Sequence, residues 1–164
     1  MQKQFDLPKD FMAAEELVSP GMSSCQGCGS ALAIKLALKA MGPRTVVVTP
    51  ACCFCVFIGA YPYSNLGVPV IQCPFETAAV VAAGVSAALD VRGERDAAVM
   101  VWAGDGGTFD IGLQALSGAA ERNENILFVC YDNEAYMNTG IQRSSATPLR
   151  SEEHTSELQS RQVI

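Results

Sequence analysis

Apolar runs of two lengths alternate along the chain. The short runs are rich in β-branched residues and predict buried strands at residues 45–49, 68–73, 97–102 and 126–132. The longer runs predict helices at residues 30–41, 76–89 and 109–122. Pro69 weakens the second strand, because proline cannot donate to a sheet ladder. Strands that alternate with helices predict an α/β fold, with a parallel sheet and helices on both faces.

The predicted helix at residues 76–89 (ETAAVVAAGVSAAL) has almost no charge, so we expect it to be buried on most sides. Hydrophobic residues make up 49% of the chain and charged residues only 17%. So little charge suggests that a partner covers part of the surface.

The last segment, Arg150–Ile164, differs from the rest of the chain. It is polar, lacks a clear apolar period and resembles the translation of a common sequencing adapter. We therefore expect three parts: an irregular N-terminal arm at residues 1–24, a partial main domain at 25–149 and a non-native tail at 150–164. The genuine sequence would then stop near Leu149, making the chain a C-terminally truncated fragment. The only histidine, His154, is given no catalytic role.

Charge and hydropathy exclude several classes of partner. The net charge of −6 becomes −5 when the tail, with three acids and two bases, is removed, so nucleic acid is not an expected ligand. No apolar run approaches the roughly 20 residues that span a bilayer, so no membrane partner is expected. The N-terminal sequence lacks a signal-peptide core, which favours a cytoplasmic protein. In that reducing compartment the seven cysteines favour metal or redox chemistry.

A glycine-rich turn with an acid inside it, Gly104-Asp105-Gly106-Gly107, follows the third predicted strand. It is not a dinucleotide fingerprint, because Phe109 stands where the third glycine is needed, and no P-loop lysine follows. A carboxylate near phosphate makes sense when a divalent cation lies between them, and Mg²⁺ binds one or two protein oxygens plus phosphate oxygens. The glycines would let the backbone approach a diphosphate at the start of the next helix.

A second oxygen ligand is expected from Asn133, which follows the fourth predicted strand. A right-handed strand–helix–strand unit returns parallel to its start. Asp105 and Asn133 should therefore meet at one edge of the sheet. The alternative is an ordinary turn in which Asp105 only caps a helix.

Two stretches together resemble a known family. Gly104-Asp105-Gly106, followed at this separation by Asn133, is similar to the thiamine diphosphate motif. The segment YDNEAYMNTGIQRSSATP, residues 131–148, resembles the β subunit of pyruvate:ferredoxin oxidoreductase, also called pyruvate synthase. The resemblance covers residues 19–148 and implies a thiamine diphosphate-binding fold.

The resemblance also implies a set of site residues. The cofactor-binding residues would be Gly104, Asp105, Gly106, Gly107, Asn133 and Ala135. Asp105 and Asn133 would hold Mg²⁺ with their side chains, and Ala135 with its carbonyl. Asn138 would lie near the thiazolium ring and the substrate, although a turn before Gly140 also explains an asparagine there.

The cysteines divide into groups. Cys25 and Cys28 form a C-x-x-C pair before the first predicted helix, a spacing used by zinc sites, redox dithiols and iron–sulfur clusters. In the family a cysteine after the first strand joins this pair, and Cys53 matches it best by alignment on the residues that follow. Cys52 and Cys55 remain alternatives. The resemblance thus implies a 4Fe–4S cluster, and a zinc knuckle is the structural alternative.

The family's fourth cluster ligand lies downstream, and no cysteine follows Cys130. We therefore expect truncation to have removed it, leaving an incomplete or absent cluster and an inactive fragment. Cys73 and Cys130 lie within apolar strands and are expected to be core thiols.

The resemblance implies an enzyme of anaerobic metabolism that oxidatively decarboxylates pyruvate to acetyl-CoA, or runs the reverse synthesis. Electrons would pass through the cluster to ferredoxin, and the partners would be coenzyme A and other subunits of α, γ and δ type. Another subunit would supply the carboxylate that activates the cofactor; Glu76 is expected only to complement a helix dipole. Two alternatives remain, a cluster-free thiamine diphosphate decarboxylase or carboligase, and a non-catalytic zinc-stabilised interaction module.

Overall fold

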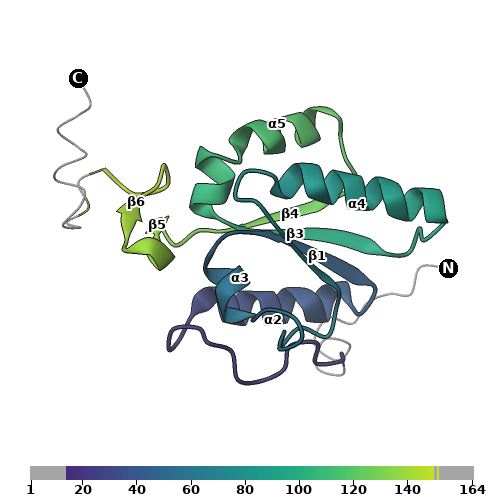
Figure 1. The fold of residues 1–164 in the computed structure, drawn as a ribbon, viewed down its shortest axis with the longest axis horizontal. Helices are drawn as coiled ribbons and strands as arrows, with labels where there is room; N and C mark the ends of the chain where they lie inside the picture. Colours follow the sequence, from purple (N-terminus) through teal and green to yellow (C-terminus); the bar gives the residue numbers. More distant parts are fainter. Residues whose placement is uncertain (1–13, 150, 152–164) are drawn as a thin grey trace.

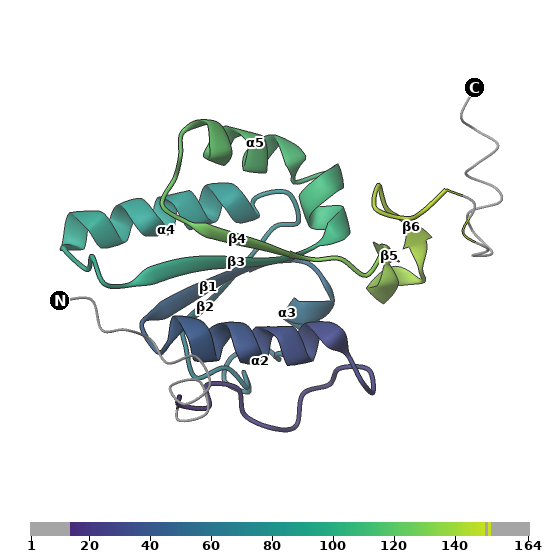
Figure 2. The ribbon, with the colours of Figure 1, turned by 180° about the vertical axis from the view of Figure 1, so that it is seen from behind.

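The computed structural model describes residues 14–149 and 151. Its centre is a parallel sheet of strands β1 (Thr45–Pro50), β2 (Val70–Cys73), β3 (Ala98–Gly104) and β4 (Leu127–Tyr131), in the order β2-β1-β3-β4. The helices are α2 (Gly29–Met41), α3 (Cys53–Phe57), α4 (Ala78–Arg92) and α5 (Leu113–Glu121). Helices α2 and α3 cover one face, and α4 and α5 the other (Figures 1 and 2). The predicted α/β fold with helices on both faces is confirmed.

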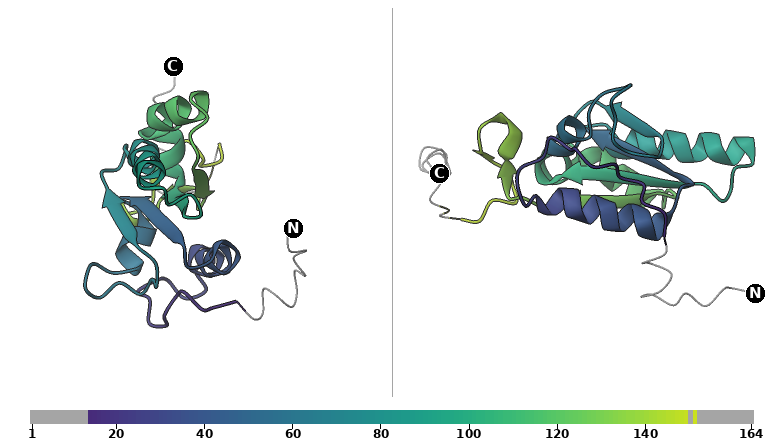
Figure 3. Two further views of the ribbon diagram at one scale, coloured as in Figure 1. Left: turned by 90° about the vertical axis from the view of Figure 1, so that its right-hand side faces the viewer. Right: turned by 90° about the horizontal axis from the view of Figure 1, so that it is seen from below.

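Each face of the sheet has its own hydrophobic cluster, because successive strand residues point to opposite sides. Val47 of β1 belongs to the cluster that contains Ile34 and Leu38 of α2. The next residue, Val48, belongs to the cluster that contains Ala82 of α4. The end-on view in Figure 3 shows the sheet lying between the two helical layers. This burial on both faces explains why the strands are continuous apolar runs.

All four strands pair in parallel, so their carboxyl ends lie at one edge of the sheet. From β1 the chain reaches β2 on one side, and α4 then carries it back to β3 on the other side of β1. Strand β4 follows next to β3, with Gly104 paired to Tyr131. Ligands of such sheets bind beyond the carboxyl ends, where the strand order reverses. Here that point lies between β1 and β3.

The single helix predicted at residues 109–122 is two segments in the structure. A π-helix, η1 (Gly106–Asp110), precedes α5, and Gly112 stands between them. A Cβ at Gly112 would lie only 1.8 Å from the Gly107 carbonyl oxygen. The close approach of these two backbone segments therefore requires glycine at residue 112. Wide helical turns of this kind are frequent at functional sites.

The segment after β4 forms a small unit that the apolar pattern does not predict. It contains β5 (Ala135–Tyr136), a 3₁₀ turn η2 (Met137–Thr139) and β6 (Gln142–Arg143), with β5 and β6 antiparallel. It lies beyond the carboxyl edge of the main sheet (Figure 1).

Helix α4 is buried on one side only, so the prediction of burial on most sides is wrong for this chain by itself. Ala78 and Ala82 are buried, whereas Val80 is 52% and Val91 89% exposed. Helix α5 packs beside α4 on the same face of the sheet, so neither covers the other's outer side (Figure 1).

The described part of the N-terminal arm joins the core. Leu17 and Val18 are buried in the α2-side cluster, and Val18 pairs with Leu66. Residues 1–13 and the tail, with His154, lie outside the described residues except for Ser151. Within the part that is described, no helix is long and apolar enough to cross a membrane.

Candidate functional site

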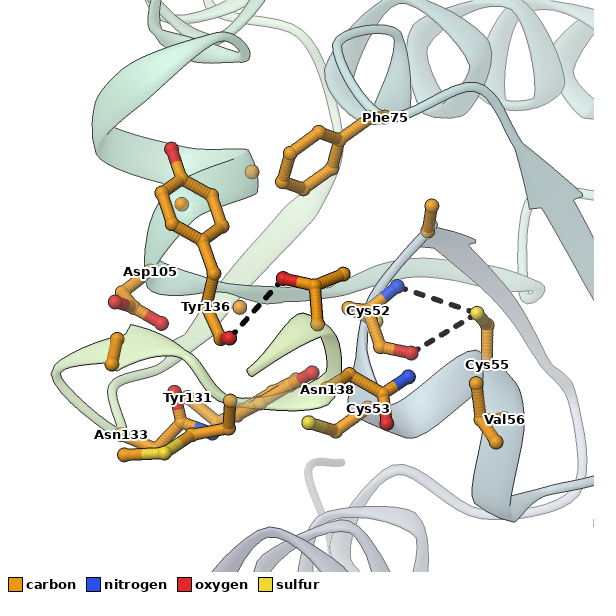
Figure 4. Close-up of a pocket in the computed structure, with 17 residues that line it drawn as sticks. Cys52, Cys53, Cys55, Val56, Phe75, Asp105, Tyr131, Asn133, Tyr136 and Asn138 are labelled. Atoms are coloured by element: carbon orange, nitrogen blue, oxygen red, sulfur yellow. Dashed lines mark hydrogen bonds between the residues drawn. The ribbon is translucent and has the colours of Figure 1, made fainter. Parts of the chain in front are cut away.

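A cavity of about 250 Å³ opens at the carboxyl edge of the sheet (Figure 4). Its lining is drawn from residues 51–56, Phe75, residues 104–107 and residues 131–139. These segments end or follow all four strands, so the fold itself gathers them at this edge.

Asp105 follows β3 directly and is almost fully buried, at 2% exposure. The Ser144 hydroxyl donates a hydrogen bond to its Oδ2 atom. Burial raises the pKa of Asp105 above its ordinary value, and the hydrogen bond from Ser144 partly opposes this. A cation beside the carboxylate would favour its ionised form.

Asn133 meets Asp105 from the neighbouring strand, as the sequence predicts. One atom of its amide group lies 2.9 Å from Asp105 Oδ1 and 3.0 Å from the Ala135 carbonyl oxygen. In one orientation of the amide this atom is the nitrogen, which donates hydrogen bonds to both oxygens. In the other orientation it is the amide oxygen, and Asp105, Asn133 and Ala135 then present three oxygens to one point. Neighbouring oxygens around octahedral Mg²⁺, with bonds of about 2.0–2.1 Å, stand about 2.9 Å apart. The donor set fits magnesium, whose binding here stays a prediction.

The side chain of Asn133 also reaches Cys53. A hydrogen bond from Asn133 lowers the pKa of Cys53, against the larger upward effect of burial. When the amide oxygen faces Asp105, the amide nitrogen is the atom left to donate to the Cys53 sulfur. One side chain thus connects the predicted magnesium ligands to a predicted cluster ligand.

The glycines of the turn accommodate two aromatic rings. A Cβ on Gly106 would lie 2.2 Å from Cε1 of Tyr136, and one on Gly107 would lie 3.1 Å from Cε2 of Phe75. The two rings meet edge to face, with their centroids 6.0 Å apart. Glycine is therefore needed here for close ring packing, whether or not a diphosphate also approaches the backbone.

The segment after β4 is tied back to η1 by hydrogen bonds. The Tyr136 hydroxyl donates to Asp110 Oδ2 at 2.5 Å, and the Ser145 backbone N–H donates to Asp110 Oδ1 at 3.2 Å. Ser144 donates to Asp105 as described above. The sequence patterns predict no role for Ser144, Ser145 or Tyr136. The only signal there was their place in the family-like segment at residues 131–148.

Cys25 and Cys28 are close enough to Cys53 for their charges to affect its pKa. Cys25 and Cys28 close a turn in which the Cys28 N–H donates to the Cys25 carbonyl at 3.1 Å, directly before α2. Burial raises the pKa of Cys53 most, and the charges of Cys52, Cys25 and Cys28 add to it. Among residues 14–149 and 151, no three His, Cys, Asp or Glu side chains are arranged to hold one metal ion. Thiolates of a cubane cluster bind different irons, so they stand farther apart than ligands of one ion.

Cys52 and Cys55 have a different role from Cys53, because they cap α3. The Cys52 N–H donates to Cys55 Sγ at 3.3 Å, and the two side chains form a capping box. Hydrogen bonds from Cys55 and then Thr49 lower the pKa of Cys52 to about 6, against the upward effect of burial. These capping contacts leave Cys53 as the thiol that faces Asn133, which favours it as the cluster ligand.

The other residues considered in the sequence lie at different places in the structure. Asn138 lies in η2 and its exposed side chain lines the cavity. Glu76 lies instead in a separate groove between α4 and α5. Cys73 is partly buried against the α4-side cluster, and Cys130 is also partly buried, so neither is a fully enclosed core thiol.

Comparisons with known proteins agree with this arrangement. Residues 65–162 match the family described as thiamine pyrophosphate enzyme, C-terminal TPP binding domain. Over 134 residues the chain is 54% identical to pyruvate synthase subunit PorB of Methanothermobacter thermautotrophicus, covering 82% of this chain and 46% of the relative. Over 139 residues it is 52% identical to ketoisovalerate oxidoreductase subunit VorB of Pyrococcus abyssi, covering 82% and 45%. The chain thus spans about half the length of these relatives.

A solved structure is also similar. It is the 2-oxoglutarate:ferredoxin oxidoreductase from Magnetococcus marinus with 2-oxoglutarate, coenzyme A and succinyl-CoA bound. The TM-score is 0.62 and the identity 25%, over 78% of this chain and 43% of that one.

Proposed function

The chain belongs to the thiamine pyrophosphate enzymes, and from this membership we propose that it is part of the β subunit of a 2-oxoacid:ferredoxin oxidoreductase acting on pyruvate. The enzyme would convert pyruvate and coenzyme A to acetyl-CoA, or run in reverse, and would exchange electrons with ferredoxin. It would act in the cytoplasm, together with subunits of α, γ and δ type. The relatives' names and the family-like segment at residues 131–148 support this proposal.

The proposal rests above all on the oxygen set of Asp105, Asn133 and Ala135 beside the cavity. These three groups would hold Mg²⁺, and the backbone at Gly106 and Gly107 would receive the diphosphate. When bound, thiamine diphosphate supplies a nucleophilic carbon and takes up the electron pair released by decarboxylation.

The chain's own residues would prepare the site for this chemistry. Ser144 would keep the Asp105 carboxylate aimed at the cation, because it donates to the oxygen turned away from Asn133. Phe75 and Tyr136 would exclude water around the turn. Asn138, on the cavity wall, would face the substrate.

Cys25, Cys28 and Cys53 would supply three thiolates of a 4Fe–4S cluster, with the fourth ligand outside the described residues. The nearness of Cys53 to Asn133 supports a cluster beside the cofactor. A cluster at this position suits single-electron transfer to ferredoxin, which a simple decarboxylase does not need.

The test is the complete complex, purified anaerobically with its other subunits. We expect bound iron and thiamine diphosphate, and ferredoxin reduction that needs both coenzyme A and a 2-oxo acid. The value of kcat/KM should be higher for pyruvate than for 2-oxoisovalerate, because the resemblance at residues 131–148 is to the pyruvate enzyme.

Each other outcome points to a different function. A higher kcat/KM for 2-oxoisovalerate would replace pyruvate with a branched substrate, as the VorB-named relative suggests. A colourless complex that still decarboxylates would indicate a cluster-free thiamine enzyme. Bound zinc without thiamine diphosphate would indicate an interaction module.

A further inference from the structure

Cys52 and Cys55 form a second C-x-x-C pair, which the proposed cluster does not use. The candidate ligand Cys53 lies between them, and all three residues line the cavity. The two flanking thiols therefore need their own explanation.

The sulfur of Cys55 lies over the backbone of Cys52. The Cys52 N–H donates to Cys55 Sγ at 3.3 Å, and the Cys55 thiol donates to the Cys52 carbonyl at 3.1 Å (Figure 4). Thr49 Oγ1 lies 3.4 Å from Cys52 Sγ and holds that sulfur at the same end of α3. The two sulfurs are thus gathered at one helix terminus.

The backbone spacing suits a covalent bridge. From the rise and radius of an α-helix, residues three apart have Cα atoms about 5 Å apart. Disulfides span Cα separations of about 4.4–6.8 Å. Cys52 is the N-cap residue of α3 and Cys55 lies in its first turn, so their backbone separation falls within the range of a disulfide.

Both thiols are also within reach of a small molecule, because both are partly exposed on the cavity wall. Cys73 provides a contrast. It is also partly exposed, but its thiol donates to the Thr49 carbonyl at 3.5 Å and it is not part of the cavity lining. A soluble oxidant in the cavity would therefore meet Cys52 and Cys55 and not Cys73.

We propose that Cys52 and Cys55 are a redox-sensitive pair that closes to a disulfide in the wall of the cavity. The oxidant is a low-molecular-weight disulfide such as oxidised glutathione. The thiolate of one cysteine attacks a sulfur of the oxidant, forms a mixed disulfide and releases one glutathione. The second cysteine loses its proton, attacks the mixed disulfide and releases the other glutathione. The cysteine pair loses two electrons and two protons, and the oxidant is reduced to two thiols.

The inference goes beyond the proposed function and does not depend on it, because the measured quantity is a sulfur–sulfur bond. The reduced, iron-free full chain is equilibrated anaerobically with mixtures of reduced and oxidised glutathione. Remaining thiols are then alkylated, and the peptides are mapped by tandem mass spectrometry. We expect a Cys52–Cys55 bridge that increases with the proportion of oxidised glutathione and disappears with dithiothreitol.

Three variants locate the bond. Cys53→Ser and Cys73→Ser should leave the bridge intact. Cys55→Ser should abolish it and accumulate glutathione on Cys52, because the attacking partner is missing. Serine retains a capping hydroxyl, and circular dichroism checks that each variant is folded.

Two results would overturn the proposal. In one, Cys52 and Cys55 both remain alkylatable at a glutathione ratio that already oxidises Cys25 and Cys28. In the other, the disulfide found in the unsubstituted chain joins Cys53 to Cys52 or Cys55.

Discussion

Burial of Asp105 has opposite effects on the stability of the metal-free chain and on the binding of a cation. The residue is 2% exposed, and burial raises the pKa of its carboxyl group, so an ionised Asp105 destabilises the metal-free chain. The same burial strengthens its attraction to a cation, because water does not screen the charge. A residue that suits a magnesium site is therefore a poor choice for stability alone.

The first prediction follows from that conflict. We expect Asp105→Asn to raise the free energy of unfolding of the metal-free chain by about 1–2 kcal/mol at neutral pH, because it removes a buried charge. For an acid whose folded-state pKa is raised, stability is full at low pH and is lost as the pH rises through that pKa. The advantage of the variant should therefore shrink as the pH falls toward 3.8, the ordinary value. Denaturant unfolding across this pH range tests it, and a pH-independent difference would contradict the argument.

The second prediction concerns Gly106. A methyl group there would overlap the ring of Tyr136 at 2.2 Å, so Gly106→Ala must displace the ring and its hydrogen bond to Asp110. We expect a loss of about 1–3 kcal/mol in the free energy of unfolding. The matched control is Gly84→Ala in α4, where nothing lies within 4 Å and alanine should be neutral or stabilising. Equal effects of the two substitutions in thermal unfolding would count against steric overlap as the cause.

At the scale of elements, the sequence predicts those helices and strands whose position is determined by the spacing of hydrophobic residues. All four sheet strands and the helices α2 and α4 lie within a few residues of their predicted ranges, because each buries a continuous apolar run or face. The π-helix could not be predicted, because it depends on Gly112 approaching the Gly107 carbonyl in space. Alignment already favours Cys53 as the cluster ligand, but the capping contacts of Cys52 and Cys55, which support that choice, cannot be read from their spacing.

The third prediction concerns Ser144, which lies in the segment after β4. Ser144 is 3% exposed and its hydroxyl is a donor to Asp105. Ser144→Ala leaves that buried carboxylate with one donor fewer, which should reduce the free energy of unfolding by about 1–3 kcal/mol at neutral pH. The loss should diminish in acid, where Asp105 is protonated. Ser117→Ala, on the exposed surface of α5, is the control and should change little. A loss at Ser144 that persists unchanged in acid would show that the hydroxyl stabilises something other than the carboxylate.

At the scale of the whole molecule, one sheet edge brings two predicted sites into contact. The oxygen set comes from the segments that follow β3 and β4, whereas the thiols come from α3 and the turn before α2. The Asn133 side chain contacts both sets. A parallel sheet achieves this because every strand ends at the same edge. The two sites share a wall but have separate ligands, so they should be separable by mutation.

The last prediction uses that separation. Thiamine diphosphate with Mg²⁺, at about 100 times its Kd, should raise the free energy of unfolding of the chain by about 2.7 kcal/mol. Asp105→Asn should lose most of this increase, yet retain bound iron in the complete complex. Cys28→Ser should show the reverse, with iron lost and the cofactor-induced stabilisation intact, because Cys28 is not among the oxygen ligands. If each substitution instead abolished both properties, the cofactor and the cluster would form one interdependent site, and Asn133 would be the contact through which each depends on the other.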